Sequence, residues 1–170
     1  MHTEYKSSVI QELRDQQIRF APRQKKVDQA LRAEQLLTEL DPTRTYTYEY
    51  VCFRITDFRP DGIREVMPGE DLSHDLRMFI EDVTDAADIQ VEEVPETVYT
   101  VDDLSEKFNV SSKTISRWRR QGLVSRRFIF GNRRRVGFLK SSVDRFVDHN
   151  RNRIRRGERF SQMTDQERRE

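Results

Sequence analysis

Basic and hydroxyl side chains recur on one side of the segment KTISRWRRQG, residues 113–122. At about 100° per residue of an α-helix, Ile115 and Trp118 fall on the opposite side. The polar side carries Lys113, Ser116, Arg117 and Arg120. Arg can pair with guanine through two parallel hydrogen bonds, and Ser or Lys can reach other base acceptors or phosphate. We therefore predict that the first three contact base edges in the major groove and that Arg120 contacts phosphate. A solvated cationic face without a ligand is the alternative.

A second cationic run lies at residues 133–135, which are all Arg. It follows a Gly-Asn pair at 131–132 that separates two alternating segments, as is typical of a tight β-hairpin. Narrow minor grooves attract Arg, and its guanidinium also binds phosphate. The run predicts a hairpin wing on which Arg133, Arg134 and Arg135 contact DNA, with a solvated turn as the alternative.

Two short capped helices would position the first cluster. Thr100 and Asp103 have the spacing of a capping box, and the first helix ends at Asn109. Ser111 caps the second helix, which Gly122 closes with a positive φ. Helices joined in this way form a helix-turn-helix, whose second helix enters the major groove.

A third helix completes the predicted domain, residues 98–156. Ser141 is expected to cap it and Gly157 to end it. Its apolar face covers the open side of the bundle with Val143, Phe146, Val147 and Ile154. Trp118 is expected in the same core because of its spacing from Ile115, although a lone Trp beside Arg could also stack on a base.

Net charge is distributed unevenly along a chain whose total is only +1. Residues 1–60 carry +1, residues 61–97 carry −10 and residues 98–170 carry +10. A basic domain whose cations are mostly Arg suggests a polyanionic partner. We expect the acidic block to compete with DNA phosphates for those Arg side chains. The C-terminal part of the basic domain either extends the phosphate footprint or is a solvated face, through Arg151, Arg153, Arg155, Arg156 and Arg159.

The preceding part of the chain, residues 1–84, predicts a mainly helical region. Apolar spacings of three and four favour two helices within residues 1–40. The segment TYTYEYVCFRITDF favours either a strand or a helix that begins near Tyr48. Residues 71–83 predict an acidic amphipathic helix whose apolar stripe needs a partner, and residues 85–97 predict an acidic linker.

Residues 157–170 predict a basic tail. Thr164 and Glu167 have capping-box spacing, so a helix begins there and is cut off after one turn. We therefore expect the chain to be a fragment of a longer protein.

Enzymatic chemistry has no visible basis in this sequence. Cys52 is the only cysteine, and His2, His74 and His149 lie far apart, so we expect no disulfide framework, metal site or cofactor. No Gly-rich phosphate loop or nucleophile with a base is visible, and no small-molecule ligand is evident. No apolar run approaches the roughly 18 residues that span a membrane, and the start lacks a signal-peptide pattern. These features predict a cytoplasmic protein that is not an enzyme.

Residues 99–149 resemble the winged helix-turn-helix of MerR-type regulators and excisionase-like proteins. The segments YTVDDLSEKFNVSSKTISRWRRQGLVSRRF and GNRRRVGFLKSSVDRFV carry the resemblance, notably at Trp118-Arg119 and Gly122-Leu123. Those regulators usually place this module first and follow it with a long dimerising helix, whereas here residues 1–98 precede it.

The whole chain also resembles the N-terminal part of large bacterial RNA polymerase sigma factors, through YEYVCFRITDFRPD, GEDLSHDLRMFIEDV and RGERFSQMTDQERRE. That resemblance implies a role in transcription initiation, with this module contacting promoter DNA outside the standard elements. The regions that bind core polymerase and the standard promoter elements are not in these 170 residues.

Together these patterns predict a mainly α protein: an N-terminal helical region with a short strand, then a winged helix-turn-helix of three helices and a β-hairpin. The functional hypothesis is a sequence-specific transcription protein that binds double-stranded DNA, with RNA polymerase or another transcription protein as a further partner. The alternative is an adaptor whose winged helix docks on acidic protein surface. The salt dependence of duplex binding distinguishes the two, because phosphate contacts release counterions.

Overall fold

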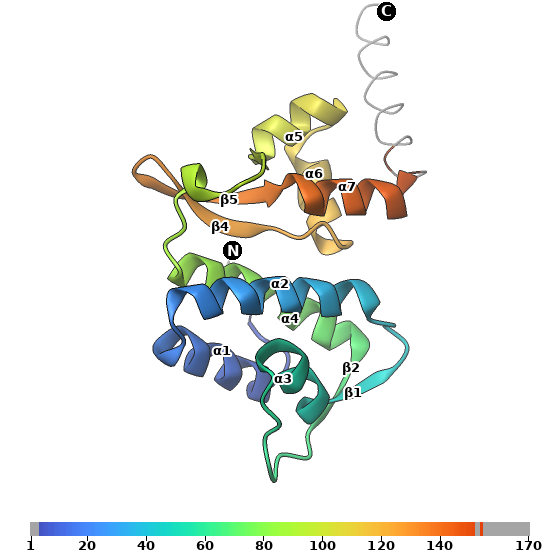
Figure 1. Cartoon of the computed structure of the whole chain (residues 1–170). Helices are drawn as coiled ribbons and strands as arrows, with labels where there is room; N and C mark the ends of the chain where they lie inside the picture. The colour runs from blue at the N-terminus through green and yellow to red at the C-terminus, as the bar shows by residue number, and fades with distance from the viewer. Residues whose placement is uncertain (1–3, 152–153, 155–170) are drawn as a thin grey trace, which may run out of the picture. The chain divides into compact units, whose positions relative to one another are not determined.

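The computed structural model describes residues 4–151 and residue 154. The chain is mainly helical and divides into two compact units, Met1–Ile89 and Gln90–Glu170 (Figure 1). The boundary falls inside the segment for which a linker is predicted. Predicted features of Arg153, Arg155, Arg156, Gly157, Arg159 and residues 157–170 lie outside the described residues.

Over residues 4–89, the N-terminal unit consists of four helices and a small two-stranded sheet. The helices are α1 (Ser8–Phe20), α2 (Arg23–Glu39), α3 (Tyr48–Thr56) and α4 (Gly69–Ala86). The strands β1 (Thr45–Thr47) and β2 (Val66–Pro68) pair antiparallel. The acidic amphipathic helix is thus α4, and α1 and α2 pack against it over a stripe of fully buried residues, as its pattern requires. The stripe consists of Leu72, Leu76, Phe79, Ile80 and Val83.

For the tyrosine-rich segment the sequence predicted either a strand or a helix that begins near Tyr48, and the structure contains both, one after the other. A three-residue strand is followed by α3, whose Thr47 cap accepts a hydrogen bond from Tyr50 N at 3.2 Å. Tyr48 is buried, while Tyr46 uses its hydroxyl to accept a hydrogen bond from Asp41 N at 2.8 Å. The helical spacing of the buried residues, rather than the alternation of tyrosines, decides the conformation.

Two acidic residues of α4 bind the start of the chain. Asp75 is fully buried, and its carboxylate oxygens accept hydrogen bonds from Lys6 N at 2.8 Å and Ser7 N at 2.9 Å. Asp82 accepts hydrogen bonds from the Tyr5 hydroxyl and the Arg14 guanidinium, both at 2.8 Å. Burial raises the pKa of Asp75, although the two backbone N–H groups act in the opposite direction. Part of the acidic block therefore holds the N-terminal unit together.

Gly69 begins α4 at a close approach of two backbones. Its N–H donates to Arg44 O at 2.7 Å, and a Cβ in its place would collide with the Asp41 carbonyl oxygen. Glycine is needed there because the backbones would otherwise have to separate.

In its described residues, 90–151 and 154, the C-terminal unit contains three helices and a three-stranded antiparallel sheet. In chain order its elements are the 3₁₀ turn η1 (Val91–Glu93), β3 (Val98–Tyr99), α5 (Val101–Phe108), α6 (Ser112–Arg120), β4 (Arg126–Phe130), β5 (Arg133–Leu139) and α7 (Lys140–His149). The strand order is β3-β5-β4. Helices α5 and α6 form the predicted helix-turn-helix, and the β4–β5 hairpin extends away from the three helices (Figure 1). The fold prediction is confirmed.

We predict that Asp75→Ala destabilises the N-terminal unit. The substitution leaves the N–H groups of Lys6 and Ser7 without their acceptor, which should lower the free energy of unfolding by about 1–3 kcal/mol. Urea denaturation followed by circular dichroism measures the loss. Asp61→Ala is the control, because it removes an exposed carboxylate and should change stability by no more than about 0.5 kcal/mol. Equal stability of the two variants would contradict the role of Asp75.

Candidate nucleic-acid interface

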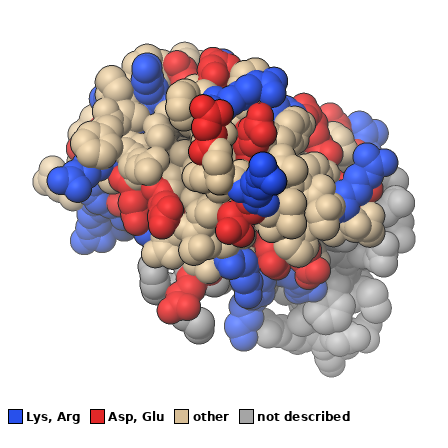
Figure 2. Space-filling model, turned by 90° about the horizontal axis from the view of Figure 1, so that it is seen from below, with Lys and Arg blue, Asp and Glu red and all other residues tan. Residues whose placement is uncertain are grey.

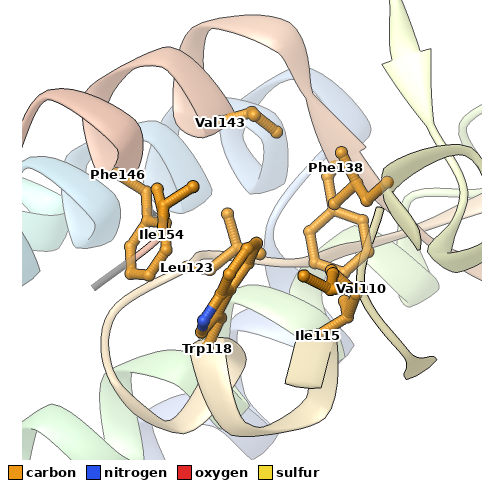
Figure 3. Packing of buried hydrophobic residues seen from close by; sticks show 9 residues of the cluster. Val110, Ile115, Trp118, Leu123, Phe138, Val143, Phe146 and Ile154 are labelled. Atoms are coloured by element: carbon orange, nitrogen blue, oxygen red, sulfur yellow. The ribbon is translucent and has the colours of Figure 1, made fainter. Parts of the chain in front are cut away.

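The orientation of α6 depends on the apolar core of the C-terminal unit. Ile115 is fully buried and Trp118 is only 3% exposed. The Trp118 ring packs edge-on against Phe108 and at a tilt against Phe146, with centroid distances of 5.6 Å and 5.7 Å. Figure 3 shows the indole among side chains from α7, β5 and the segment after α6. The prediction that Trp118 belongs to the core is confirmed, and base stacking is not available to a side chain in that position.

Local capping holds the ends of α5 and α6 as predicted. Thr100 Oγ1 accepts from Asp103 N at 3.1 Å, and Asp103 Oδ2 accepts from Thr100 N at 2.9 Å. Asn109 ends α5 in the left-handed conformation, with φ of 54°. Ser111 Oγ then accepts from Thr114 N at 3.2 Å. These caps begin α6 directly after the turn, which places its first residues at the surface.

The outward side of α6 is a cationic face, defined here as Lys113, Ser116, Arg117 and Arg120. All four residues are exposed. In the described part of the chain, the side chains of Lys113, Arg117 and Arg120 have no hydrogen bond or ion pair. Arg119 differs, because it donates to Ser125 Oγ at 3.3 Å. The structure therefore places the four predicted residues on one side of α6. It distinguishes them from Arg119, whose side chain is bound within the unit.

The hairpin presents its three Arg residues on two faces. Gly131 has φ of 62°, as the tight hairpin turns of types I′ and II′ require at their first central position. In the register of β4 and β5, Arg133 and Arg135 lie opposite Phe130 and Phe128, whereas Arg134 lies on the other face of the strand, opposite Ile129. All three are exposed. Arg134 already has an interaction partner, so Arg133 and Arg135 are the side chains of the run that remain available in the described structure.

Strand alternation is the signal that separates these residues. Successive side chains of a strand point to opposite faces, so a run of three Arg cannot act as one patch. The sequence prediction treated the run as a single set and missed this division.

The start of α7 corrects one prediction. Ser141 does not cap the helix, which begins at Lys140 after Leu139. Instead Ser141 N donates to Glu96 Oε1 at 2.8 Å, and Lys140 N donates to Thr97 O at 2.9 Å. The free N–H groups in the first turn of α7 thus bind acceptors from the segment before β3. A carboxylate is favourable at this position because the N-terminal end of a helix dipole is positive. Glu96 is thus part of the folded unit, although it lies in the predicted linker.

Other cations of the C-terminal unit are held by neighbouring carboxylates. Lys140 Nζ donates to Asp144 Oδ2 at 2.7 Å, and this hydrogen bond raises the pKa of Lys140. Arg151 donates to Asp148 Oδ1 at 3.1 Å. For Arg151 the sequence allowed either a phosphate contact or a solvated position. In the structure its side chain is exposed and forms an ion pair with Asp148.

Within residues 4–151 and 154, no group of three or more His, Cys, Asp or Glu side chains could hold a metal ion. None of the described helices combines the length and apolar character needed to cross a membrane. Cys52 is buried.

Comparison with known proteins identifies the same segment. Residues 98–151 match a family model for a helix-turn-helix domain. No curated protein and no solved structure matches the chain. The match covers about a third of the 170 residues and contains both α6 and the hairpin. A helix-turn-helix domain suggests a DNA-binding regulator, and such domains are typically not enzymes.

We predict that Trp118→Ala unfolds the C-terminal unit. Truncating a buried aromatic side chain costs about 3–5 kcal/mol, a large share of a small domain's stability. Urea denaturation followed by circular dichroism should show the loss of this transition. Arg120→Ala, on the exposed side of the same helix, should stay within about 0.5 kcal/mol of the parent protein. A stable Trp118→Ala variant would show that the indole does not hold α6 in place.

Proposed function

We propose that this chain is a sequence-specific transcription protein that reads double-stranded DNA with α6. The observation that carries the proposal is the cationic face of α6 inside the segment that matches a helix-turn-helix domain. The second helix of such a motif lies in the major groove, with its N-terminal residues nearest the base edges. Lys113, Ser116 and Arg117 would contact bases, and Arg120 would contact phosphate.

The hairpin would act as the wing. Arg133 and Arg135 are exposed and have no partner in the described residues, so they are suited to phosphate or to a narrow minor groove. Arg134 would contribute after exchanging its present interaction for a phosphate. Contacts of this kind position a protein on the duplex without reading its sequence.

Two resemblances support a more specific role for the chain. The resemblance of residues 99–149 to MerR-type modules supports a regulator. The resemblance of the whole chain to the N-terminal part of large bacterial sigma factors supports a role in transcription initiation, with RNA polymerase as a partner. On either assignment we place a mainly helical domain at residues 1–84 and the DNA-binding domain at residues 98–156.

The central test asks whether Arg117 recognises a base or only supplies positive charge. Arg117→Ala should cost about 1–3 kcal/mol on the preferred site and relax base preference at one position. Arg117→Lys should also lose that preference, because an ammonium cannot form two parallel hydrogen bonds, but should keep affinity for random duplex. Binding-site selection with each variant, followed by titration of the selected duplex, makes the comparison.

Thermal melts of both variants serve as the folding control. A folded Arg117→Ala protein with unchanged sequence preference would show that α6 does not read bases. The adaptor that docks on acidic protein surface would then be the better hypothesis.

A second prediction concerns the wing. Arg133→Ala and Arg135→Ala should weaken binding to all duplex sequences alike, and removing one phosphate contact should reduce the slope of log affinity against log salt by about 0.9. Fluorescence anisotropy with random duplex over a range of salt concentrations measures this slope. Arg64→Ala removes an exposed charge from the N-terminal unit and should leave the slope unchanged. Equal slopes for all three variants would remove the hairpin from the interface.

A further inference from the structure

A half-open cavity of about 580 Å³ lies in the N-terminal unit. Helices α1, α2 and α3 and the segment 57–63 form its walls. Three large apolar side chains on its lining are exposed: Phe20 at 74%, Phe58 at 66% and Ile63 at 38%. We call the cavity with these three side chains the aromatic groove. Exposed apolar surface gathered at one concave site is typical of a protein interaction surface.

Local hydrogen bonds hold Phe58 at the edge of the groove. Asp57 ends α3 in the left-handed conformation, with φ of 65°, and its Oδ1 accepts from Arg32 Nη1 on α2 at 2.7 Å. Phe58 N donates to Thr56 Oγ1 at 3.1 Å, and this hydroxyl donates in turn to Cys52 O at 2.7 Å. The turn that carries Phe58 is thus tied to two helices, so little ordering is needed when a partner binds.

Phe20 is presented in a similar way at the end of α1. Ala21 N donates to Gln17 O at 2.9 Å, and Lys26 Nζ on α2 donates to Ala21 O at 2.9 Å. The Arg19 guanidinium lies 5.3 Å from the centre of the Phe20 ring. These hydrogen bonds fix the backbone next to Phe20, and the ring remains exposed.

We propose that the aromatic groove binds the aromatic groove of a second copy of this chain, in a two-fold symmetric dimer. Such an interface uses the same patch on both subunits, so the patch must complement itself. This one contains both a cavity and projecting aromatic side chains, so each copy can supply the projection that the other receives.

The charges on the groove lining also favour a second copy. On the lining, Arg32 and Asp57 pair with each other, and the further charged residues are the acidic Glu12 and Asp28 and the basic Lys25. A patch with both signs can pair with itself, whereas a patch of one sign would repel its copy. Figure 2 shows, on the face of the molecule seen from below, acidic and basic side chains interspersed with uncharged surface. The dimer does not depend on DNA binding, and either proposal can fail without the other.

Sedimentation equilibrium of the full chain over a wide concentration range tests the proposal. The parent protein should dimerise, and Phe20→Glu and Phe58→Glu should each weaken association by at least about tenfold, as expected for central aromatic residues of an interface. Val66→Glu is the matched control: Val66 is 62% exposed on β2 and does not line the cavity. Circular dichroism melts confirm that the three variants fold.

A cross-linking experiment gives a second measurement. Phe58→Cys should form covalent dimers with a bifunctional maleimide at protein concentrations where Val66→Cys and the parent protein, whose Cys52 is buried, do not. A chain that stays monomeric at all concentrations overturns the proposal and leaves the groove to a different protein. A dimer that the Phe20 and Phe58 substitutions do not weaken also overturns it, because the interface would then lie elsewhere.

Discussion

The burial of one side of α6 is the constraint on which the candidate interface depends. A nine-residue helix is marginal in isolation, so packing of its apolar side holds it in place. Ile115 and Trp118 supply that packing against Phe108 and Phe146. Because the two sides of a helix are rigidly related, inserting the indole into the core turns Arg117 and its cationic neighbours outward. Specificity for DNA would thus rest on a residue that touches no DNA.

The N-terminal unit is organised around α4 in a different way. Its apolar stripe is buried by α1 and α2, and two of its carboxylates bind the segment before α1. A tethered acidic block was expected to compete with DNA for the basic domain. Asp75 and Asp82 are engaged within their own unit. Asp75 is buried, and a buried carboxylate must be satisfied by donors where it lies. The partly exposed Asp82 binds Tyr5 and Arg14. Net charge along the sequence overstates how much negative charge is available to a partner.

The two units present different kinds of surface to binding partners. The C-terminal unit presents charged side chains from a short helix and a hairpin, and so small a surface would supply few base contacts. Helix-turn-helix proteins commonly obtain specificity by placing two copies on successive half-sites. The aromatic groove of the N-terminal unit would provide the second copy without using any residue of the cationic face. Association and DNA recognition would then be separable by substitution.

Short-range signals in the sequence determined the helix-turn-helix: the capping box at Thr100, the Ser111 cap and the spacing of Ile115 and Trp118 all act within one or two helical turns. The same signals identified the cationic face of α6. Only the tertiary structure decided that Glu96, 45 residues away, binds Ser141 N. The tertiary structure also decided that Arg134 has a partner, whereas Arg133 and Arg135 have none among the residues that the structure describes. It also decided that Phe20, which shares the periodicity of a core residue, is exposed. Periodicity shows that a helix has an apolar side, but neighbouring elements decide how much of that side is covered.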